Sequence, residues 1–375
     1  MELKNLLFDL VSINSANLNY SKKAAGEKEI GNFIYDYFKK NNIDCIKQEV
    51  ADDRSNIIAK IENKKSEDTI LFCPHLDTVF LEGMDFNPKI VGGKIYGPGS
   101  CDTKASLAAM INTFIEIRKN NLKTPSLYFA GVISEETLHL GIKKFIEEFK
   151  DFNLAVIGEP TNLNVGIAHK GALRLRINTK GKSAHGSTPG DGINAIYNME
   201  KLIFKLRTKL IPEYNKRITS NLGCPTLNIG FINGGTAFNI VPDFCYIEVD
   251  RRIIPGETLK DIINDFKEII SDLKEKEENF SAQIEKPLDY IPYLETDKDE
   301  KIVKVAYSST LKFIQNPEII SMPYTTDGGF LSDMKIPTIV LGPGDVKVCH
   351  RLGEYVELQQ VSLASKIYKD ICINY

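Results

Sequence analysis

The sequence predicts an α/β protein in which a three-layer α/β domain is interrupted by a smaller α+β unit. In the first half of the chain, continuous apolar runs alternate with segments that carry an apolar helical face. This alternation stops near residue 172 and returns near residue 290. Such alternation is typical of layered α/β domains, and 375 residues suffice for about two domains. We therefore expect a discontinuous three-layer domain, residues 1–171 with 288–375, and an inserted domain, residues 172–287.

The discontinuous three-layer domain is predicted from strands that are apolar almost throughout, as expected when helices cover both faces of a largely parallel sheet. Ligands of such sheets collect at the carboxyl ends of the strands, so polar residues at those ends are candidates for a site. Besides an amphipathic helix at the N-terminus, we expect strands at 55–62, 69–75, 126–134, 153–159, 318–324 and 337–344, and helices at 103–119, 140–149, 301–314 and 356–371.

The inserted unit is predicted to be ferredoxin-like. Leu173, Leu175 and Ile177 alternate with polar residues, which indicates a strand with one exposed face. The predicted elements follow the order β-α-β-β-α-β of a ferredoxin-like unit. After the first strand we expect a helix at 193–206, strands at 225–234 and 243–253, a helix at 258–276 and a strand at 280–291.

Composition and charge exclude several classes of protein. The chain is 42% hydrophobic and 26% charged, as globular domains are, and its net charge of −3 argues against nucleic acid as a partner. No apolar run is long enough to span a bilayer, and the N-terminus lacks the pattern of an export signal. The seven cysteines show no paired spacing, so we expect reduced thiols and a cytoplasmic protein without a membrane partner.

His75 and Asp77 form a His-x-Asp pair where the strand 69–75 ends. Residues two apart in a strand share a face, so the Asp77 carboxylate could accept a hydrogen bond from the His75 ring and select its tautomer. The alternative is a histidine that caps a loop, and the pair taken alone favours this alternative.

Four further acidic residues and a second histidine lie at comparable positions. Asp102 follows a glycine-rich turn and precedes a helix, so it is either the helix N-cap or a carboxylate that bridges two metals. Glu135 and Glu136 end a buried strand, where one could bind metal and the other act as general base. Their alternative is a charged pair on a solvated loop, and Glu159 and His350 could likewise be solvated loop residues. Gathered at one sheet edge, however, these side chains would suit a metal-assisted hydrolase.

An ordered set of short motifs resembles the M20 family of metallopeptidases, which includes acetylornithine deacetylase, succinyl-diaminopimelate desuccinylase, aminoacylase and glutamate carboxypeptidase. Each motif is weak alone, but together they cover nearly the whole chain in order. The motifs are HLDTV, YGPGSCDTKASLAAM, SEE, IGEPT, GKSAHGSTP, NGGTAFNIVPD, VDRRIIPGET, TDGG and LGPGDVKVCHRLGEYVE.

The resemblance implies a zinc-exopeptidase-like catalytic domain that holds two zinc ions, with cobalt or manganese as alternatives. One ion would be held by His75 and Glu159, the other by Glu136 and His350, and Asp102 would bridge the two ions. The family often has a cis peptide after the bridging aspartate, which here is Asp102–Thr103.

The resemblance also implies roles in catalysis. Glu135 would be the general base and Asp77 would orient His75. His185 resembles a histidine that reaches the partner subunit's active site and stabilises the oxyanion, although the residues alone favour a surface-loop histidine.

Three residues would bind substrate. Asn239 resembles a substrate-binding asparagine, and Arg252 resembles the arginine that holds a substrate carboxylate, whereas Arg251 should face the other way. Gly328 would let substrate approach the backbone, unless it only serves a turn.

We therefore expect a homodimeric, metal-dependent hydrolase that cleaves the amide of N-acyl amino acids, with the inserted domain as lid and dimer interface. IGEPT and DRRIIPGE favour the branch of acetylornithine deacetylase and the desuccinylase. HLDTVFLEGM and YGPG favour the alternative, a glutamate carboxypeptidase or dipeptidase of the same family. A non-catalytic binder of metal or amino acids is the third alternative, but the proposed ligand and base positions all keep suitable residues.

Overall fold

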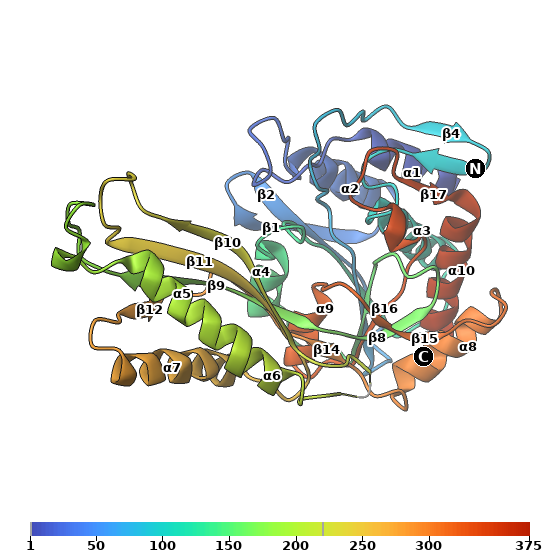
Figure 1. The fold of residues 1–375 in the computed structure, drawn as a ribbon. Coiled ribbons are helices and arrows are strands. Elements are labelled where there is room, and N and C mark those ends of the chain that lie inside the picture. Colours follow the sequence, from blue (N-terminus) through green and yellow to red (C-terminus); the bar gives the residue numbers. More distant parts are fainter. Residues whose placement is uncertain (1, 220) are drawn as a thin grey trace. The chain divides into compact units, whose positions relative to one another are not determined.

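The computed structural model describes residues 2–219 and 221–375. The chain forms two compact units (Figure 1). The first unit contains the residues up to Ala168 together with Leu294–Tyr375, and the second is His169–Tyr293. Within the described residues, no helix has the length and apolarity that a bilayer crossing needs.

The first unit is built on a nine-stranded mixed sheet. Four central strands, β6, β3, β7 and β16, run parallel, whereas β1, β2 and β8 pair antiparallel with their neighbours. Along the sheet the strands are β1 (Asp44–Ala51), β2 (Arg54–Ile61), β6 (Ser126–Gly131), β3 (Thr69–Cys73), β7 (Leu154–Ile157), β16 (Thr338–Val340), β8 (Val165–His169) and β14 (Leu294–Glu295), with β15 (Ile319–Met322) paired to β8.

Helices cover both faces of this sheet. Asn56 and Ile57 are consecutive in β2 and therefore point to opposite faces. Ile57 lies against Gly31 of one helix, while the Asn56 side chain donates to the Gly141 carbonyl of another, at 2.8 Å. These two helices, α2 and α4, therefore form opposite layers. The helices of this unit are α1 (Glu2–Ser12), α2 (Lys28–Lys40), α3 (Lys104–Lys119), α4 (Leu140–Glu148), α8 (Lys301–Leu311), α9 (Gly328–Asp333) and α10 (Leu358–Asn374).

Aromatic side chains fill the core between the sheet and the layer that contains α2. Phe72 of β3 contacts the rings of Phe114 in α3 and Tyr368 in α10. Phe38 of α2 contacts Phe114 and Phe129 in the same cluster. Edge-to-face ring pairs of this kind stabilise cores beyond their burial, so the central strands are held firmly under the site that follows them.

A small sheet completes the first unit. It consists of β17 (Tyr355–Glu357), β5 (Lys94–Tyr96) and β4 (Lys89–Val91). A short 3-10 turn, η3 (Val346–Val348), precedes β17 along the chain.

The second unit has the sheet order β10-β11-β9-β12, and its pairs are antiparallel. Leu173, Leu175 and Ile177 of β9 are buried against Leu202 and Phe266 of the two main helices, as their alternation predicts. The elements are β9 (Gly171–Lys180), η1 (Pro189–Asp191), α5 (Ala195–Lys205), a π-turn (Leu206–Leu210), α6 (Ile211–Tyr214), β10 (Thr226–Gly234), β11 (Phe244–Ile253), α7 (Leu259–Lys276), β12 (Ala282–Ile284) and β13 (Asp289–Ile291).

Local sequence explains where these helices begin. The Asn194 side chain accepts from the backbone N–H groups of Ile196 and Tyr197, and Thr258 with Asp261 forms a capping box. Such caps satisfy N–H groups that the first turn of a helix leaves unpaired.

The predicted α/β architecture with a ferredoxin-like insertion is confirmed, and three details were wrong. The large sheet is mixed rather than largely parallel, because β1, β2 and β8 run antiparallel. The strand expected at 280–291 is two short strands, β12 and β13, since Pro287 between them has no N–H to donate. The strand expected at 126–134 ends at Gly131, so residues 132–134 lie outside the strand.

Candidate dinuclear metal centre

The candidate site lies within the first unit, where the central parallel strands end. His75 comes two residues after β3, and Glu159 comes two residues after β7, its neighbour in the sheet. Glu135 and Glu136 follow β6 on the other side of β3, and His350 follows β16. Parallel strands end at one edge, so the sheet itself brings these side chains together.

Asp102 lies between the two histidines. Its Oδ1 is 3.0 Å from Nε2 of His75, and its Oδ2 is 3.1 Å from Nε2 of His350. The Asp102–Thr103 peptide is cis, as the resemblance implied. One carboxylate thus presents a different oxygen to each imidazole, which is the arrangement that a bridging ligand needs.

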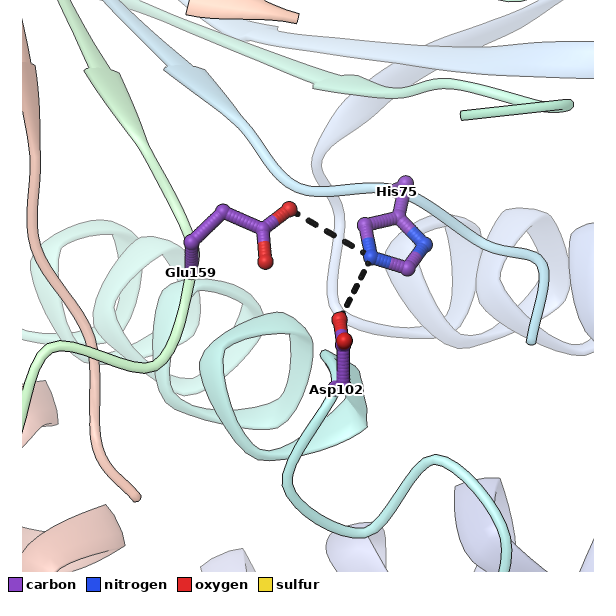
Figure 2. Close-up of side chains that lie close together, drawn as sticks. All are labelled: His75, Asp102 and Glu159. Atoms are coloured by element: carbon purple, nitrogen blue, oxygen red, sulfur yellow. Dashed lines mark hydrogen bonds and ion pairs between the residues drawn. The ribbon is translucent and has the colours of Figure 1, made fainter. Parts of the chain in front are cut away.

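Each half of the site also has a carboxylate of its own. Glu159 Oε1 is 3.4 Å from Nε2 of His75, and Figure 2 shows Asp102 and Glu159 converging on this one nitrogen. Glu136 Oε2 is 3.2 Å from Nε2 of His350. Two groups of three potential ligands, His75–Asp102–Glu159 and Asp102–Glu136–His350, therefore share Asp102.

Asp77 contacts His75 mainly through its main chain. Nδ1 of His75 donates to the main-chain carbonyl of Asp77 at 2.9 Å, whereas the Asp77 carboxylate is 3.6 Å away, beyond hydrogen-bond distance. A carbonyl only accepts, so Nδ1 carries the proton and Nε2 is free to bind a cation. The carboxylate instead accepts from Asn17 Nδ2 (2.8 Å) and from the backbone N–H groups of Glu135 and Glu136 (3.0 Å each). Asp77 thus orients both His75 and the Glu135–Glu136 turn.

The electrostatics of the site favour the binding of cations. Burial raises the pKa of Glu135, Glu136 and Glu159, and neighbouring carboxylates raise them further. Hydrogen bonds to Asp102 and Glu136 raise the pKa of His350 to about 11. Oε1 of Glu136 is buried without a hydrogen-bond partner in the described part of the chain. Buried carboxylates and imidazoles with an orphaned oxygen fit a pair of divalent cations.

We predict that the contribution of His350 to the stability of the chelator-treated protein falls as pH rises from 6.5 to 8.5. His350, with its folded pKa raised above the unfolded value, stabilises the fold fully below about pH 6.5 and loses that contribution as pH rises toward 11. The raised pKa values of Glu135 and Glu159 act in the same direction. Burial raises the pKa of Asp102, but hydrogen bonds to His350 and His75 outweigh burial and lower it overall. Asp102 therefore changes the pH dependence of stability only at acidic pH.

Urea unfolding of the metal-free parent and of His350→Gln at pH 6.5, 7.5 and 8.5 measures this contribution as the difference in stability between the two proteins, which should shrink as pH rises. A difference that stays constant or grows across this range would contradict the raised pKa of His350.

Comparisons with known proteins identify the family of this chain. A peptidase dimerisation domain model matches residues 167–278, and a peptidase family M28 model matches residues 56–214. Acetylornithine deacetylase of Aliivibrio fischeri (strain MJ11) is 31% identical over 386 aligned positions, which cover 99% of each chain. The chain belongs to the M20 family of metallopeptidases and deacylases. Members of this family are metal-dependent amidohydrolases.

Solved structures show the same M20 fold. Aminopeptidase PepT from Bacillus cereus superposes with a TM-score of 0.82 at 23% identity, over 99% of this chain and 97% of that one. A dinuclear metal-binding M20 peptidase from Bacillus subtilis has a TM-score of 0.74 at 16% identity, over 100% and 97%.

In the second unit of this M20 protein, the structure separates the three predicted lid residues into two places. His185 and Asn239 are neighbours, since Gly186 N–H donates to the Asn239 carbonyl (2.8 Å) and His185 forms a β-bridge with Ile240. Arg252 is near the far end of β11, where it pairs with Ala172, while Phe244 at the near end pairs with Lys180.

The neighbouring arginines of β11 differ as the strand alternation predicts. Arg251 is fully buried and its NH2 group contacts Glu257 at 2.5 Å. Arg252 is partly exposed and its Nε lies 2.8 Å from Asp250 Oδ1.

Gly328 has a packing reason in the first unit. A Cβ there would lie 2.6 Å from Leu294 Cδ1 and 3.0 Å from Ile157 Cγ1. Close packing alone therefore requires glycine at the start of α9, and contact with substrate stays a prediction.

Sequence reasoning missed several residues that support the site. Glu354 is buried behind the Asp102 loop, and Asn17 holds Asp77. His139, to which no role was assigned, is buried and its Nδ1 lies 2.8 Å from Asp327 Oδ1, close to Glu135. Asp327 belongs to the TDGG motif that was singled out only for its glycine. A buried acid or histidine inside an apolar context is the one signal that could have drawn attention to these residues.

Three cysteines lie beside the candidate ligands. Cys73 and Cys101 are buried and Cys349 is half-buried. Burial raises the pKa of the Cys73 thiol, and for Cys349 contact with Cys101 raises the pKa most. A high pKa keeps these thiols protonated in the metal-free protein, as is typical of cysteines with a packing role.

Proposed function

We propose that this M20 protein hydrolyses the amide bond of N-acyl amino acids, with N-acetylornithine as the first candidate substrate and two zinc ions as the first candidate metals. The observation that carries the proposal is the placement of Asp102, whose two oxygens face His75 and His350 separately. The similarity to acetylornithine deacetylases over the whole chain supports the substrate class. We also propose that the enzyme acts in the cytoplasm.

The residues present fit two metal positions. His75, Glu159 and Asp102 would hold one ion, and Glu136, His350 and Asp102 the other. When bound, the pair of ions would lower the pKa of the attacking water and polarise the acyl carbonyl. Cobalt or manganese would suit the same oxygen and nitrogen donors.

Glu135 is the proposed general base. Its backbone N–H donates to the Asp77 carboxylate, and this hydrogen bond fixes its position. Glu135 belongs to neither of the two ligand groups that share Asp102. It would take the proton from the attacking water and later deliver that proton to the leaving amine. Burial raises its pKa, and a carboxylate with a raised pKa is a better base near neutral pH.

His185 is the proposed oxyanion donor. Its Nδ1 accepts from the backbone N–H of Ser187 at 3.1 Å, so the neutral ring carries its proton on Nε2. This nitrogen is then available to donate to a developing negative charge. The side chain is exposed in a loop of the second unit.

The distances within the second unit support a homodimer. Phe244, near the loops of His185 and Asn239, is eight residues from Arg252 along β11, which corresponds to about 26 Å at about 3.3 Å per residue. A small substrate cannot reach both ends of this strand. We propose that Arg252 holds the substrate carboxylate in its own subunit, while His185 and Asn239 come from the partner copy.

A substrate panel tests the proposed function. We expect the metal-loaded protein to show its highest kcat/KM on N-acetylornithine, measured as release of free amine beside N-succinyl-diaminopimelate, a folyl-glutamate and a dipeptide. The chelator-treated protein serves as control and should be inactive on all four. Preference for the folyl-glutamate or the dipeptide would instead assign the carboxypeptidase or dipeptidase alternative.

A further inference from the structure

The loop that carries Asp102 is held from behind by the buried side chain of Glu354. Oε1 of Glu354 accepts from the backbone N–H groups of Cys101 (2.8 Å) and Asp102 (2.9 Å), and Oε2 accepts from that of Gly99 (3.1 Å). The main-chain carbonyl of Glu354 accepts from Gly97 N–H at 3.0 Å. One residue therefore satisfies four backbone donors of the turn that leads to the bridging aspartate.

Two hydrogen bonds within the turn support it as well, from Ser100 N–H to the Gly97 carbonyl (3.1 Å) and from Lys104 N–H to the Gly99 carbonyl (2.9 Å). Gly99 has a φ of +72°, and a Cβ there would lie 2.4 Å from Thr78 Cγ2, so the chain passes close to its neighbours in a conformation that glycine tolerates best. The N–H groups are buried, and a buried N–H without an acceptor is costly. A carboxylate that accepts three of them forms charge-assisted hydrogen bonds, which are stronger than neutral ones.

Glu354 also connects this turn to the second histidine. It follows His350 by four residues in the same loop and immediately precedes β17, whose Tyr355 pairs with Tyr96 of β5. The loop of His350 and the turn of Asp102 are thus joined at Glu354. By contrast, His75 and Glu159 follow β3 and β7, which pair directly in the central sheet.

We propose that Glu354 is a positioning residue for the second metal position, that of Asp102, Glu136 and His350. It fixes the positions of Asp102 and His350 relative to each other, although it would contact neither ion. The first position depends on it less, because the paired strands β3 and β7 place His75 and Glu159. This inference rests on the proposed dinuclear site.

The test compares Glu354→Gln with a matched control. Glutamine keeps the shape but loses the charge. Its NH2 group would replace one of the two accepting oxygens and, being a donor itself, could not accept from the backbone N–H groups. We expect the parent to bind two Co²⁺ ions per chain, and the variant to bind one ion as the parent does and the other about 10–100-fold less tightly, as for other residues that orient ligands. Metal analysis after dialysis and titration with Co²⁺ measure both affinities without reference to turnover.

Glu257→Gln is the control. The Glu257 side chain is only 8% exposed, accepts from the backbone N–H of Ile254 (3.1 Å) and contacts two arginines, but it belongs to the second unit. The control should lose stability and keep both affinities. Should Glu354→Gln fail to fold, Glu354→Asp replaces it, because the shorter side chain keeps the charge and cannot reach all three N–H groups.

The outcomes separate this inference from the proposed function. A Glu354 variant that binds both ions as the parent does, or that weakens both equally, overturns the positioning role while the dinuclear site stands. A parent that binds no pair of ions overturns both.

Discussion

Glu135→Gln is expected to lower kcat by about 10²- to 10⁴-fold, the usual contribution of a general base, while both metals remain bound. Glutamine has nearly the same shape but cannot take a proton from water. Glu135 is outside the two ligand groups that meet at Asp102, so its replacement leaves their donors intact. Steady-state kinetics on the preferred substrate and metal analysis of the same samples measure the two effects.

The adjacent residue provides the control for this experiment. Glu136 Oε2 is 3.2 Å from His350 Nε2, so Glu136→Gln should release one of the two ions. The two neighbouring substitutions should therefore differ in metal content, although both lower activity. A Glu135→Gln enzyme as active as the parent would show that another group is the base.

Asp102→Asn should weaken the binding of both ions and lower kcat/KM by at least about 10²-fold, since metal ions contribute several kcal/mol to the transition state and each 1.36 kcal/mol is tenfold. The Asn side chain has no charge and only one oxygen, so it cannot present an oxygen ligand beside both His75 and His350. Its NH2 group, which only donates hydrogen bonds, would lie beside one of the two imidazoles. Metal titration and kinetics on the variant measure both losses.

Asp289→Asn is a suitable comparison, because Asp289 is a similarly enclosed aspartate paired with Arg174 (2.9 Å) in the second unit. That variant should keep both ions. If Asp102→Asn lost only one of its two ions, Asp102 would be a ligand of a single metal and the bridging geometry would have to be abandoned.

Most elements could be predicted because their patterns are local. The helix expected at 103–119 is α3, Lys104–Lys119, whose buried Leu107, Ile111 and Phe114 recur at helical spacing. The strand expected at 280–291 failed for a local reason too, since Pro287 interrupts it. The antiparallel pairing of β1, β2 and β8 had no local signal, because strand direction depends on where the chain returns in the sheet.

The supporting residues of the site could not be predicted because their partners are distant in sequence. Glu354 accepts hydrogen bonds from residues more than 250 positions away, and its surroundings in HRLGEYVE resemble an ordinary polar loop. The Asp77 carboxylate likewise finds its partners in Asn17, Glu135 and Glu136 rather than in the nearby His75. Spacing along the chain carries no information about such contacts.

Most strands and helices, and the polar residues that follow the strands, were determined by the sequence alone, since apolar periodicity and the residue types of its motifs are properties of short segments. Which oxygen of Asp102 faces which histidine, and which buried acids hold the loops in place, was decided only by the tertiary structure. The physical reason is that hydrogen bonds and ion pairs act over about 3 Å in space, whatever separates their partners along the chain.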